Sequence, residues 1–248
     1  MHHKKKLGQH FLVDQNIINK LVKTISPNKK DTVIEIGPGD GALTELILQN
    51  SKHLRVFEID ERFSALLKKK YINSNIKVFN EDFLSVDLKD VAIDQNIIMG
   101  NLPYNVSSQI IIKIIESNLR YQHCVFLIQK ELANRFINSS KLSIQSQIFC
   151  KIEALFDIPP EAFDPAPKVN STLIKITPHD KYKKYIQSYS NFKKILNICF
   201  ANPRKKISTA LKNINVDTSQ FSFDINSRAE ELEIHHYFEI LVQYESQI

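Results

Sequence analysis

The tetrapeptide Asn-Leu-Pro-Tyr at 101–104 combines residue types that can act on an aromatic amine. The side-chain oxygen of Asn101 and the carbonyl of Leu102 are two hydrogen-bond acceptors, and Pro103 favours an extended Leu102 that presents its carbonyl outward. Two acceptors on the N–H groups of an adenine amine would draw its nitrogen toward tetrahedral geometry and aim the lone pair at a methyl group. Tyr104 would stack on the extracted base. Position and polarisation would supply the rate with no metal ion. An ordinary strand-to-helix turn is the alternative.

A second candidate site is the glycine-rich segment 35–41, Glu-Ile-Gly-Pro-Gly-Asp-Gly, which overlaps the end of the strand-like run 32–36. Only five of the 248 residues are glycine and three of them lie here, which indicates a backbone turn that approaches a ligand closely. A dinucleotide turn is one interpretation. The carboxylates of Glu35 and Asp40 disfavour a pyrophosphate and favour a cationic ligand such as S-adenosylmethionine. We assign Gly8 to an arm over the cofactor and Gly100 to the entry of the base pocket.

Two carboxylates follow later strand-like runs. Glu58 closes the run 54–59, and Asp82 comes shortly after the run 76–79. Because the carboxyl ends of parallel strands share one edge of a sheet, both side chains are expected near the glycine turn. Glu58 would then accept hydrogen bonds from ribose hydroxyls and Asp82 from an adenine amine, unless both are only solvated strand ends.

A proline-rich loop, Phe-Asp-Pro-Ala-Pro-Lys-Val, occupies 163–169. Its stiff prolines could hold Phe163 against the second face of the target base. Punctuation of a hairpin is the alternative interpretation, because proline is tolerated at a sheet edge.

The elements that must position these residues alternate between strand-like and helical patterns, which predicts a doubly wound α/β sheet. The expected parallel strands are 32–36, 54–59, 76–79, 96–99 and 123–128. Two further runs, 152–158 and 171–176, predict an antiparallel hairpin at the sheet edge, giving seven strands. A helix capped by Asp14 precedes the sheet. We expect a cofactor-binding domain at 1–178, with an arm at 1–13, and a small all-α domain at 179–248.

Composition limits the class of protein. The chain has 43% hydrophobic residues and three cysteines without a Cys-x-x-Cys pair, so we expect a cytoplasmic protein with no zinc site. No run reaches membrane-spanning length, and no apolar stretch follows the basic amino terminus as in a secretory signal. The net charge of +6 is local, because 181–216 holds nine basic and no acidic residues. That block is either a solvated helix face or a surface for a polyanion.

Taken together, these motifs resemble the ribosomal RNA adenine N6,N6-dimethyltransferases, most closely their bacterial small-subunit branch, the KsgA family. The resemblance also includes Gly-Gln-His-Phe-Leu at 8–12 and Gln-Lys-Glu at 129–131, and it runs nearly end to end. It implies a Rossmann-like methyltransferase sheet with a helical rRNA-binding domain. After Arg135 the chain departs from the family, since a shorter loop occupies 138–143.

The resemblance implies roles for individual residues. The positions that would contact S-adenosylmethionine are His10, Leu12, Gly37, Gly39, Glu58, Asp82 and Asn101. Those around the target adenine would be Asn101, Leu102, Tyr104 and Phe163, and those on rRNA would be Arg204, Lys205 and Lys206.

The implied substrate is a pair of adjacent adenosines in the 3′-terminal hairpin loop of 16S rRNA, each dimethylated within an immature 30S subunit. The sequence leaves the oligomeric state open, with a monomer as the default expectation. Two alternatives stay open. One is the related resistance enzyme that dimethylates 23S rRNA, and the other is an assembly factor that binds pre-ribosomal RNA without catalysis.

Overall fold

The structure, a computed structural model, describes residues 9–91, 96–117 and 119–247. The first eight residues of the predicted arm, Gly8 among them, therefore lie outside the described residues. The chain divides into two compact units, one made of the residues up to Ala133 with Glu153–Pro178, the other of Asn134–Ile152 with His179–Ile248. One boundary between the two units lies at 178, and 134–152 belongs to the second unit.

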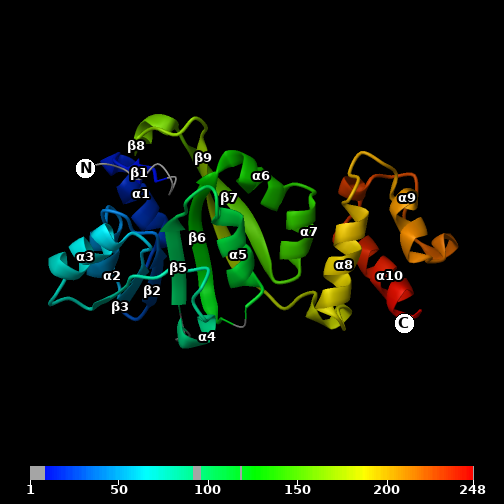
Figure 1. The fold of residues 1–248 in the computed structure, drawn as a ribbon, viewed down its shortest axis with the longest axis horizontal. Helices are drawn as coiled ribbons and strands as arrows, with labels where there is room; N and C mark the ends of the chain where they lie inside the picture. Colours follow the sequence, from blue (N-terminus) through cyan, green and yellow to red (C-terminus); the bar gives the residue numbers. More distant parts are fainter. Residues whose placement is uncertain (1–8, 92–95, 118, 248) are drawn as a thin grey trace. The chain divides into compact units, whose positions relative to one another are not determined.

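A seven-stranded sheet forms the centre of the first unit (Figure 1). Its order is β4-β3-β2-β5-β6-β9-β7. The strands are β2 (Thr32–Ile36), β3 (His53–Phe57), β4 (Ile76–Phe79), β5 (Asn96–Asn101), β6 (Tyr121–Gln129), β7 (Cys150–Ile158) and β9 (Ser171–Pro178). The first five strands in this order pair in parallel and β9 is antiparallel to β6, with β7 at the edge beside β9. The predicted α/β class and seven strands are confirmed.

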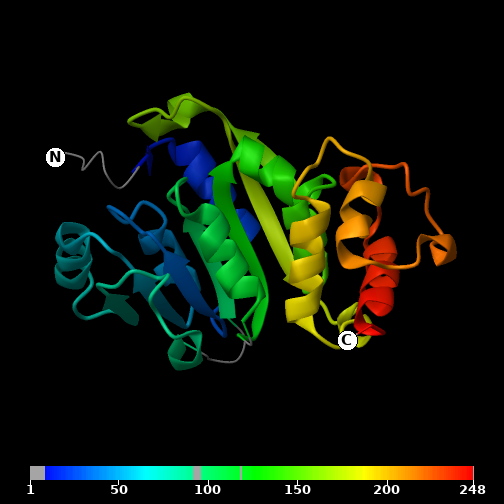
Figure 2. The ribbon, with the colours of Figure 1, turned by 45° about the vertical axis from the view of Figure 1, so that its right-hand side comes forward.

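Helices cover both faces of this sheet, with α5 in front in Figure 1 and α1 behind, as the turned view in Figure 2 also shows. The strands β2 and β5 are buried along most of their length, as expected for a parallel sheet between helices. The helices of this part of the chain are α1 (Gln15–Ile25), α2 (Thr44–Asn50), α3 (Glu61–Lys70), α4 (Leu88–Val91), α5 (Ser107–Ile115) and α6 (Lys130–Ile137).

The helix α1 shows why this layer forms. Asp14 caps it by accepting hydrogen bonds from the backbone N–H groups of Asn16 and Ile17, as predicted. Its apolar residues belong to the same core cluster as alternate residues of the central strands, because side chains on a strand point to opposite faces in turn. The contributing residues include Ile18, Leu21, Ile25, Val33, Ile97, Met99, Val125 and Leu127.

A small two-stranded sheet joins the amino-terminal arm to the proline loop. β1 (Phe11–Leu12) pairs antiparallel with β8 (Phe163–Asp164), with Leu12 opposite Phe163. The N–H of Val13 also donates to the carbonyl of Ala162 at 2.9 Å. The arm is therefore held by a segment about 150 residues later in the chain.

The second unit is helical and has its own hydrophobic core. Its helices are α7 (Lys141–Gln147), α8 (Tyr189–Cys199), α9 (Ile207–Leu211) and α10 (Ile234–Glu245), joined by short 3₁₀ turns. Ile144 and Ile148 pack in the same cluster as Phe192 and Ile195 of α8, which explains why α7 belongs to this unit. None of the helices in the described part of the chain is both long and apolar enough to cross a bilayer.

Candidate active site

One cavity lies at the carboxyl ends of β2, β3 and β5, beneath the arm. Such an edge is where open α/β sheets bind ligands. Nine of the predicted site residues line this cavity: His10, Leu12, Gly37, Gly39, Glu58, Asp82, Asn101, Leu102 and Tyr104. The sequence motifs therefore converge on one site, although up to 94 residues separate them along the chain.

Asn101 is the last residue of β5, and its side-chain amide is held in a fixed orientation. The Nδ2 group donates to the backbone carbonyl of His10 at 2.8 Å. Because the amide nitrogen is the donor in this bond, the Oδ1 atom remains an acceptor for another group. The arm therefore fixes which end of the Asn101 amide can serve as an acceptor.

The carbonyl of Leu102 is the second predicted acceptor. The N–H of Leu102 donates to the carbonyl of Leu127 at 3.1 Å, which ties the tetrapeptide to β6. The hydroxyl of Ser107 lies 3.5 Å from the Leu102 carbonyl but only 2.8 Å from the carbonyl of Pro103. A hydroxyl has one proton to donate, so the Leu102 carbonyl keeps most of its capacity to accept a hydrogen bond.

Tyr104 follows at the cavity wall. Its hydroxyl shares a hydrogen bond with the Ser171 hydroxyl at 2.6 Å, and burial raises the pKa of the phenol above its ordinary value, although this bond opposes the rise. One face of the ring stacks on the ring of His10, with centroids 5.3 Å apart. The Nδ1 atom of His10 lies 2.6 Å from the carbonyl of Pro165, which only accepts, so Nδ1 carries the proton. His10 therefore connects Tyr104 to the proline loop.

Phe163 is not at the cavity wall. Its side chain is 3% exposed and belongs to the core cluster with Leu12, Leu127 and Leu173. Alternation along β8 explains this position, because Phe163 points inward while Asp164 is exposed. The sequence led us to expect this ring against a target base, but it lies in the core instead.

The glycine turn has the backbone geometry that only glycine adopts readily. Gly37, Gly39 and Gly41 have φ of 68°, 57° and 90°. A Cβ on Gly39 would lie 2.8 Å from the ring of Phe11. On Gly100 it would lie 2.3 Å from the carbonyl oxygen of Ile36 in the neighbouring strand. At these two positions atoms of the protein itself therefore leave no room for a side chain.

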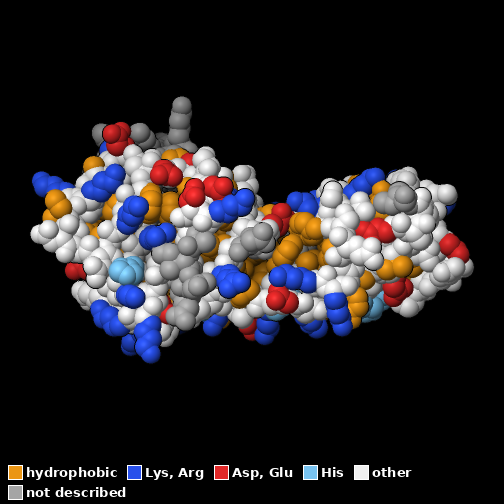
Figure 3. All heavy atoms as spheres, turned by 90° about the horizontal axis from the view of Figure 1, so that it is seen from below, with side chains coloured by type: hydrophobic (Ala, Val, Ile, Leu, Met, Phe, Trp, Pro, Cys, Tyr) orange, Lys and Arg blue, Asp and Glu red, His pale blue; other side chains and the backbone are white. Residues whose placement is uncertain are grey.

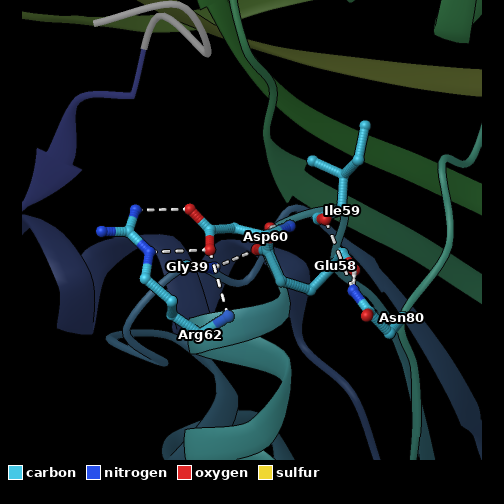
Figure 4. A network of polar contacts seen from close by, with 6 residues as sticks. All are labelled: Gly39, Glu58, Ile59, Asp60, Arg62 and Asn80. Carbon is cyan, nitrogen blue, oxygen red and sulfur yellow. Dashed lines mark hydrogen bonds and ion pairs between the residues drawn. The ribbon is translucent and has the colours of Figure 1, made fainter. Parts of the chain in front are cut away.

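Glu58 lies at the centre of a polar network (Figure 4). Its carboxylate accepts the N–H of Gly39 at 2.9 Å and that of Asp60 at 2.7 Å. Asn80 donates to its backbone carbonyl at 2.8 Å. Burial raises the pKa of Glu58, and the backbone hydrogen bonds oppose that rise. Each carboxylate oxygen keeps a lone pair, so a diol could still bind to this fixed group.

Two further acidic residues line the cavity. Glu35 is 1% exposed, and its pKa is raised to about 7 by burial, with smaller contributions from Glu58 and Asp40 and with opposition from the Thr44 hydrogen bond. Asp82, in contrast, is exposed at the cavity edge and accepts the N–H of Leu84 at 2.9 Å.

Gln9 also lines the cavity, although it is not among the site residues predicted from the sequence. Its Oε1 atom is buried and has no hydrogen-bond partner among the residues that the structure describes. A buried acceptor without a partner costs free energy, which a donor on a bound ligand would recover. Together with Glu35 and Glu58, it gives a set of acceptors that suits a ligand with a cationic centre and hydroxyl or ammonium donors, as S-adenosylmethionine has. Nothing in the residue type or spacing distinguishes this glutamine from an ordinary loop residue.

No group of three or more His, Cys, Asp or Glu side chains able to hold a metal ion occurs within residues 9–91, 96–117 and 119–247.

The predicted rRNA contacts lie in the helical unit. Arg204, Lys205 and Lys206 are exposed just before α9, and the Lys206 ammonium donates to the Asn226 side chain at 2.9 Å. On the face in Figure 3, basic side chains are spread over both units among hydrophobic and acidic ones. The three residues are accessible to a polyanion.

The fold and the cavity define an S-adenosylmethionine-dependent methyltransferase of the Rossmann-like class. The chain belongs to the ribosomal RNA adenine dimethylase family, whose sequence model matches residues 1–245, and is an rRNA adenine dimethyltransferase. A Sulfurihydrogenibium protein, ribosomal RNA small subunit methyltransferase A, is 38% identical over 96% of this chain and 94% of its own. The protein of the same name from Ureaplasma parvum is 37% identical over 92% and 89%.

Solved structures share the whole fold. A dimethyladenosine transferase from Plasmodium falciparum superposes with a TM-score of 0.79 over 96% of this chain and 98% of its own, at 24% identity. The 23S rRNA methyltransferase ErmE gives 0.75 over 95% and 99%, at 19% identity. At these identities the likeness speaks for the fold, which both enzymes share.

Proposed function

We propose that this enzyme transfers methyl groups from S-adenosylmethionine to N6 of two adjacent adenosines in the 3′-terminal hairpin loop of 16S rRNA, within immature 30S subunits. The names of relatives 32–38% identical over more than nine-tenths of the chain support a small-subunit substrate. The 23S rRNA enzyme, in contrast, resembles this chain at 19% identity. We also propose that the protein acts as a cytoplasmic monomer, that 1–178 catalyses and that 179–248 binds rRNA.

The orientation of Asn101 is the observation that carries this proposal. With its Nδ2 group held by His10, the Oδ1 atom is the acceptor for one N–H of the target amine. The Leu102 carbonyl accepts the other. Two such bonds favour a tetrahedral nitrogen whose lone pair can attack the methyl group. Because the acceptors are already fixed in place, they need no reorganisation when the reaction occurs.

The remaining cavity residues bind and orient. S-adenosylmethionine supplies an electrophilic methyl group on a sulfonium. Glu58 would accept hydrogen bonds from the ribose hydroxyls and Asp82 from the cofactor adenine, with Gly37, Gly39 and Leu12 close to the ligand. Tyr104 would stack on the target base, through the face that His10 leaves open or after the His10 ring moves. Phe163 would act through the arm that it anchors rather than through direct contact, because it pairs with Leu12.

The direct test is mapping of the product. Purified protein is incubated with immature 30S subunits and labelled S-adenosylmethionine, and dimethyladenosine is located by primer extension and mass spectrometry. We expect two adjacent dimethyladenosines in the 3′-terminal loop of 16S rRNA. Label confined to 23S rRNA would instead identify the resistance activity, and tight rRNA binding without label would identify an assembly factor.

A further inference from the structure

A second hollow lies wholly within the helical unit. Its lining combines aromatic and polar side chains from the turn after the sheet, from the 3₁₀ segment near 220 and from α10. The residues that matter here are Tyr182, Tyr185, Phe221, Phe238, Val242 and Gln243. We call this surface the aromatic groove.

Two large side chains of the groove are exposed beside the buried Phe238 ring. Tyr185 is 48% exposed and Val242 is 63% exposed, although both are large apolar residues. Phe238 forms the floor, stacked on Tyr185 with centroids 5.1 Å apart, and Tyr182 tilts against the same ring at 5.6 Å. The rings are therefore held in place by packing on one another, while part of the Tyr185 ring stays exposed to solvent.

Lysines are interleaved with these rings. The segment 181–185 reads Lys-Tyr-Lys-Lys-Tyr, and it opens the stretch up to 216 that holds no acidic residue. The Lys181 ammonium lies 4.7 Å from the Tyr182 ring centroid, and that of Lys184 lies 4.9 Å from the Tyr185 ring centroid. Lys183 pairs with Asp180 at 2.6 Å. Positive charge therefore stands beside each tyrosine of the groove.

The polar residues in the groove are compatible with an RNA base. The carboxylate of Glu239 accepts hydrogen bonds from the N–H and the hydroxyl of Ser222 at 2.8 and 2.5 Å, so both of its oxygens are already engaged by the protein. Gln243 donates its Nε2 group to Gln220 at 2.8 Å, so its Oε1 atom can accept a hydrogen bond from another group. Exposed rings next to lysines, with an amide acceptor near them, are the combination that binds unpaired nucleotides.

We infer that the aromatic groove binds an unpaired nucleotide of the rRNA substrate, with the base against Tyr185 and the flanking phosphates on Lys181 and Lys184. This inference rests on the proposed function, which supplies an RNA partner. The groove adds a subsite distinct from the basic residues 204–206 and from the methyl-transfer cavity. It takes flexible single-stranded RNA, because only an unpaired base offers its face to the ring.

The test compares single substitutions in the full-length protein. Binding to a fluorescent fragment of the 16S 3′ region is measured by anisotropy over a range of salt concentrations. We expect Tyr185→Ala to weaken binding about tenfold, within the range for loss of one stacked base, and Tyr185→Phe to restore it. Lys184→Ala should lower the slope of log affinity against log salt by about 0.7, the value for one phosphate of a single strand.

The controls separate a local effect from a general one. Ile72→Ala removes an exposed apolar side chain elsewhere, and Lys52→Ala removes an exposed charge from the first unit; neither should change affinity more than about twofold, as for surface changes generally. In methylation assays the Tyr185→Ala variant should show a raised KM for RNA with an unchanged kcat. Thermal unfolding checks that each variant folds.

Three outcomes distinguish the possibilities. If the wild-type protein methylates 16S rRNA but Tyr185→Ala and Lys184→Ala bind it like wild type, the groove is not an RNA site and the proposed function stands. If these variants bind the RNA fragment normally but lose affinity for assembled subunits, the groove takes a ribosomal protein, which also overturns the inference. Failure of the wild-type protein to bind or methylate rRNA would overturn the proposed function itself.

Discussion

The side-chain amide of Asn101 donates a hydrogen bond to the backbone carbonyl of His10, 91 residues earlier in the chain, at 2.8 Å. This bond joins the end of β5 to the arm that β1 pairs with β8. Asn101, the acceptor proposed for the target amine, is therefore linked directly to the arm above the cavity. A change in either should alter the other.

The first prediction concerns this bond. Asn101→Asp keeps the shape of the side chain but replaces the donor by a carboxylate, which would repel the His10 carbonyl. We expect transfer to fall at least about 100-fold, comparable with removal of one preorganised hydrogen-bonding group in other enzymes, while RNA affinity stays within about twofold. Single-turnover methylation and anisotropy measure the two quantities. Asn50→Asp, on an exposed helix end, is the matched control. Transfer at the wild-type rate would show that the bond to His10 is not needed to orient the acceptor oxygen.

The second prediction compares two glycines. Gly100→Ala places a Cβ 2.3 Å from the Ile36 carbonyl, and backbone in a central strand cannot move aside, so we expect a loss of about 3 kcal/mol or more in the free energy of unfolding. Gly37→Ala meets nothing closer than 3.7 Å and is destabilised only by its positive φ, about 1–2 kcal/mol. Urea unfolding of both variants gives the difference. Equal losses would show that strand contact is not what requires glycine at position 100.

The third prediction is a pH dependence from Glu35. Its pKa is raised from 4.5 to about 7, so between these values the folded state binds a proton that the unfolded state has released. This group therefore lowers stability as the pH rises through that window, by about 3 kcal/mol in total at 1.36 kcal/mol per pKa unit. Glu35→Gln should match wild type near pH 5 and be more stable at pH 8.

Urea unfolding of the ligand-free protein at pH 5, 6.5 and 8 measures this difference. The contrast is Glu45→Gln, which removes an exposed ion pair with Lys70 whose effect on the carboxyl pKa has the opposite sign. A constant difference between wild type and Glu35→Gln across this range would mean that the Glu35 carboxyl titrates normally.

The fourth prediction concerns the basic residues before α9. Replacing Arg204, Lys205 and Lys206 together by alanine should weaken rRNA binding and reduce the salt slope, which falls by about 0.7 to 0.9 for each phosphate that the protein no longer neutralises. Cofactor affinity should not change, because none of the three lines the methyl-transfer cavity. Anisotropy at several salt concentrations and calorimetry with S-adenosylmethionine measure these effects. An unchanged slope would assign the block to a solvated surface.

The fifth prediction concerns Phe163. Because the ring is buried in the core, Phe163→Ala should destabilise the protein by about 3–5 kcal/mol, as for other large core truncations. Phe163→Leu should recover most of the stability and, if the ring only anchors the arm, most of the transfer rate. Folded Phe163→Leu protein with a normal stability and no transfer would restore the ring to direct contact with the base.

Local patterns in the sequence were sufficient for the order and type of the main elements. Alternation and apolar runs identify the seven strands of the main sheet, and Asp14 identifies the start of α1 because capping depends on neighbouring residues alone. The two motifs that meet in the cavity could also be read directly, since the carboxyl ends of parallel strands must share an edge. The pairing of β1 with β8, each only two residues long, left no comparable pattern.

What the sequence determined by itself is the class of sheet, the cofactor turn and the acceptor tetrapeptide, because each depends on residue types within a short segment. The tertiary structure decided which neighbour each of these residues has. It placed Phe163 in the core, put protein atoms where a side chain on Gly39 or Gly100 would lie, and left the Gln9 oxygen without a hydrogen-bond partner among the described residues. These outcomes depend on packing between segments far apart in the chain, which no local spacing specifies.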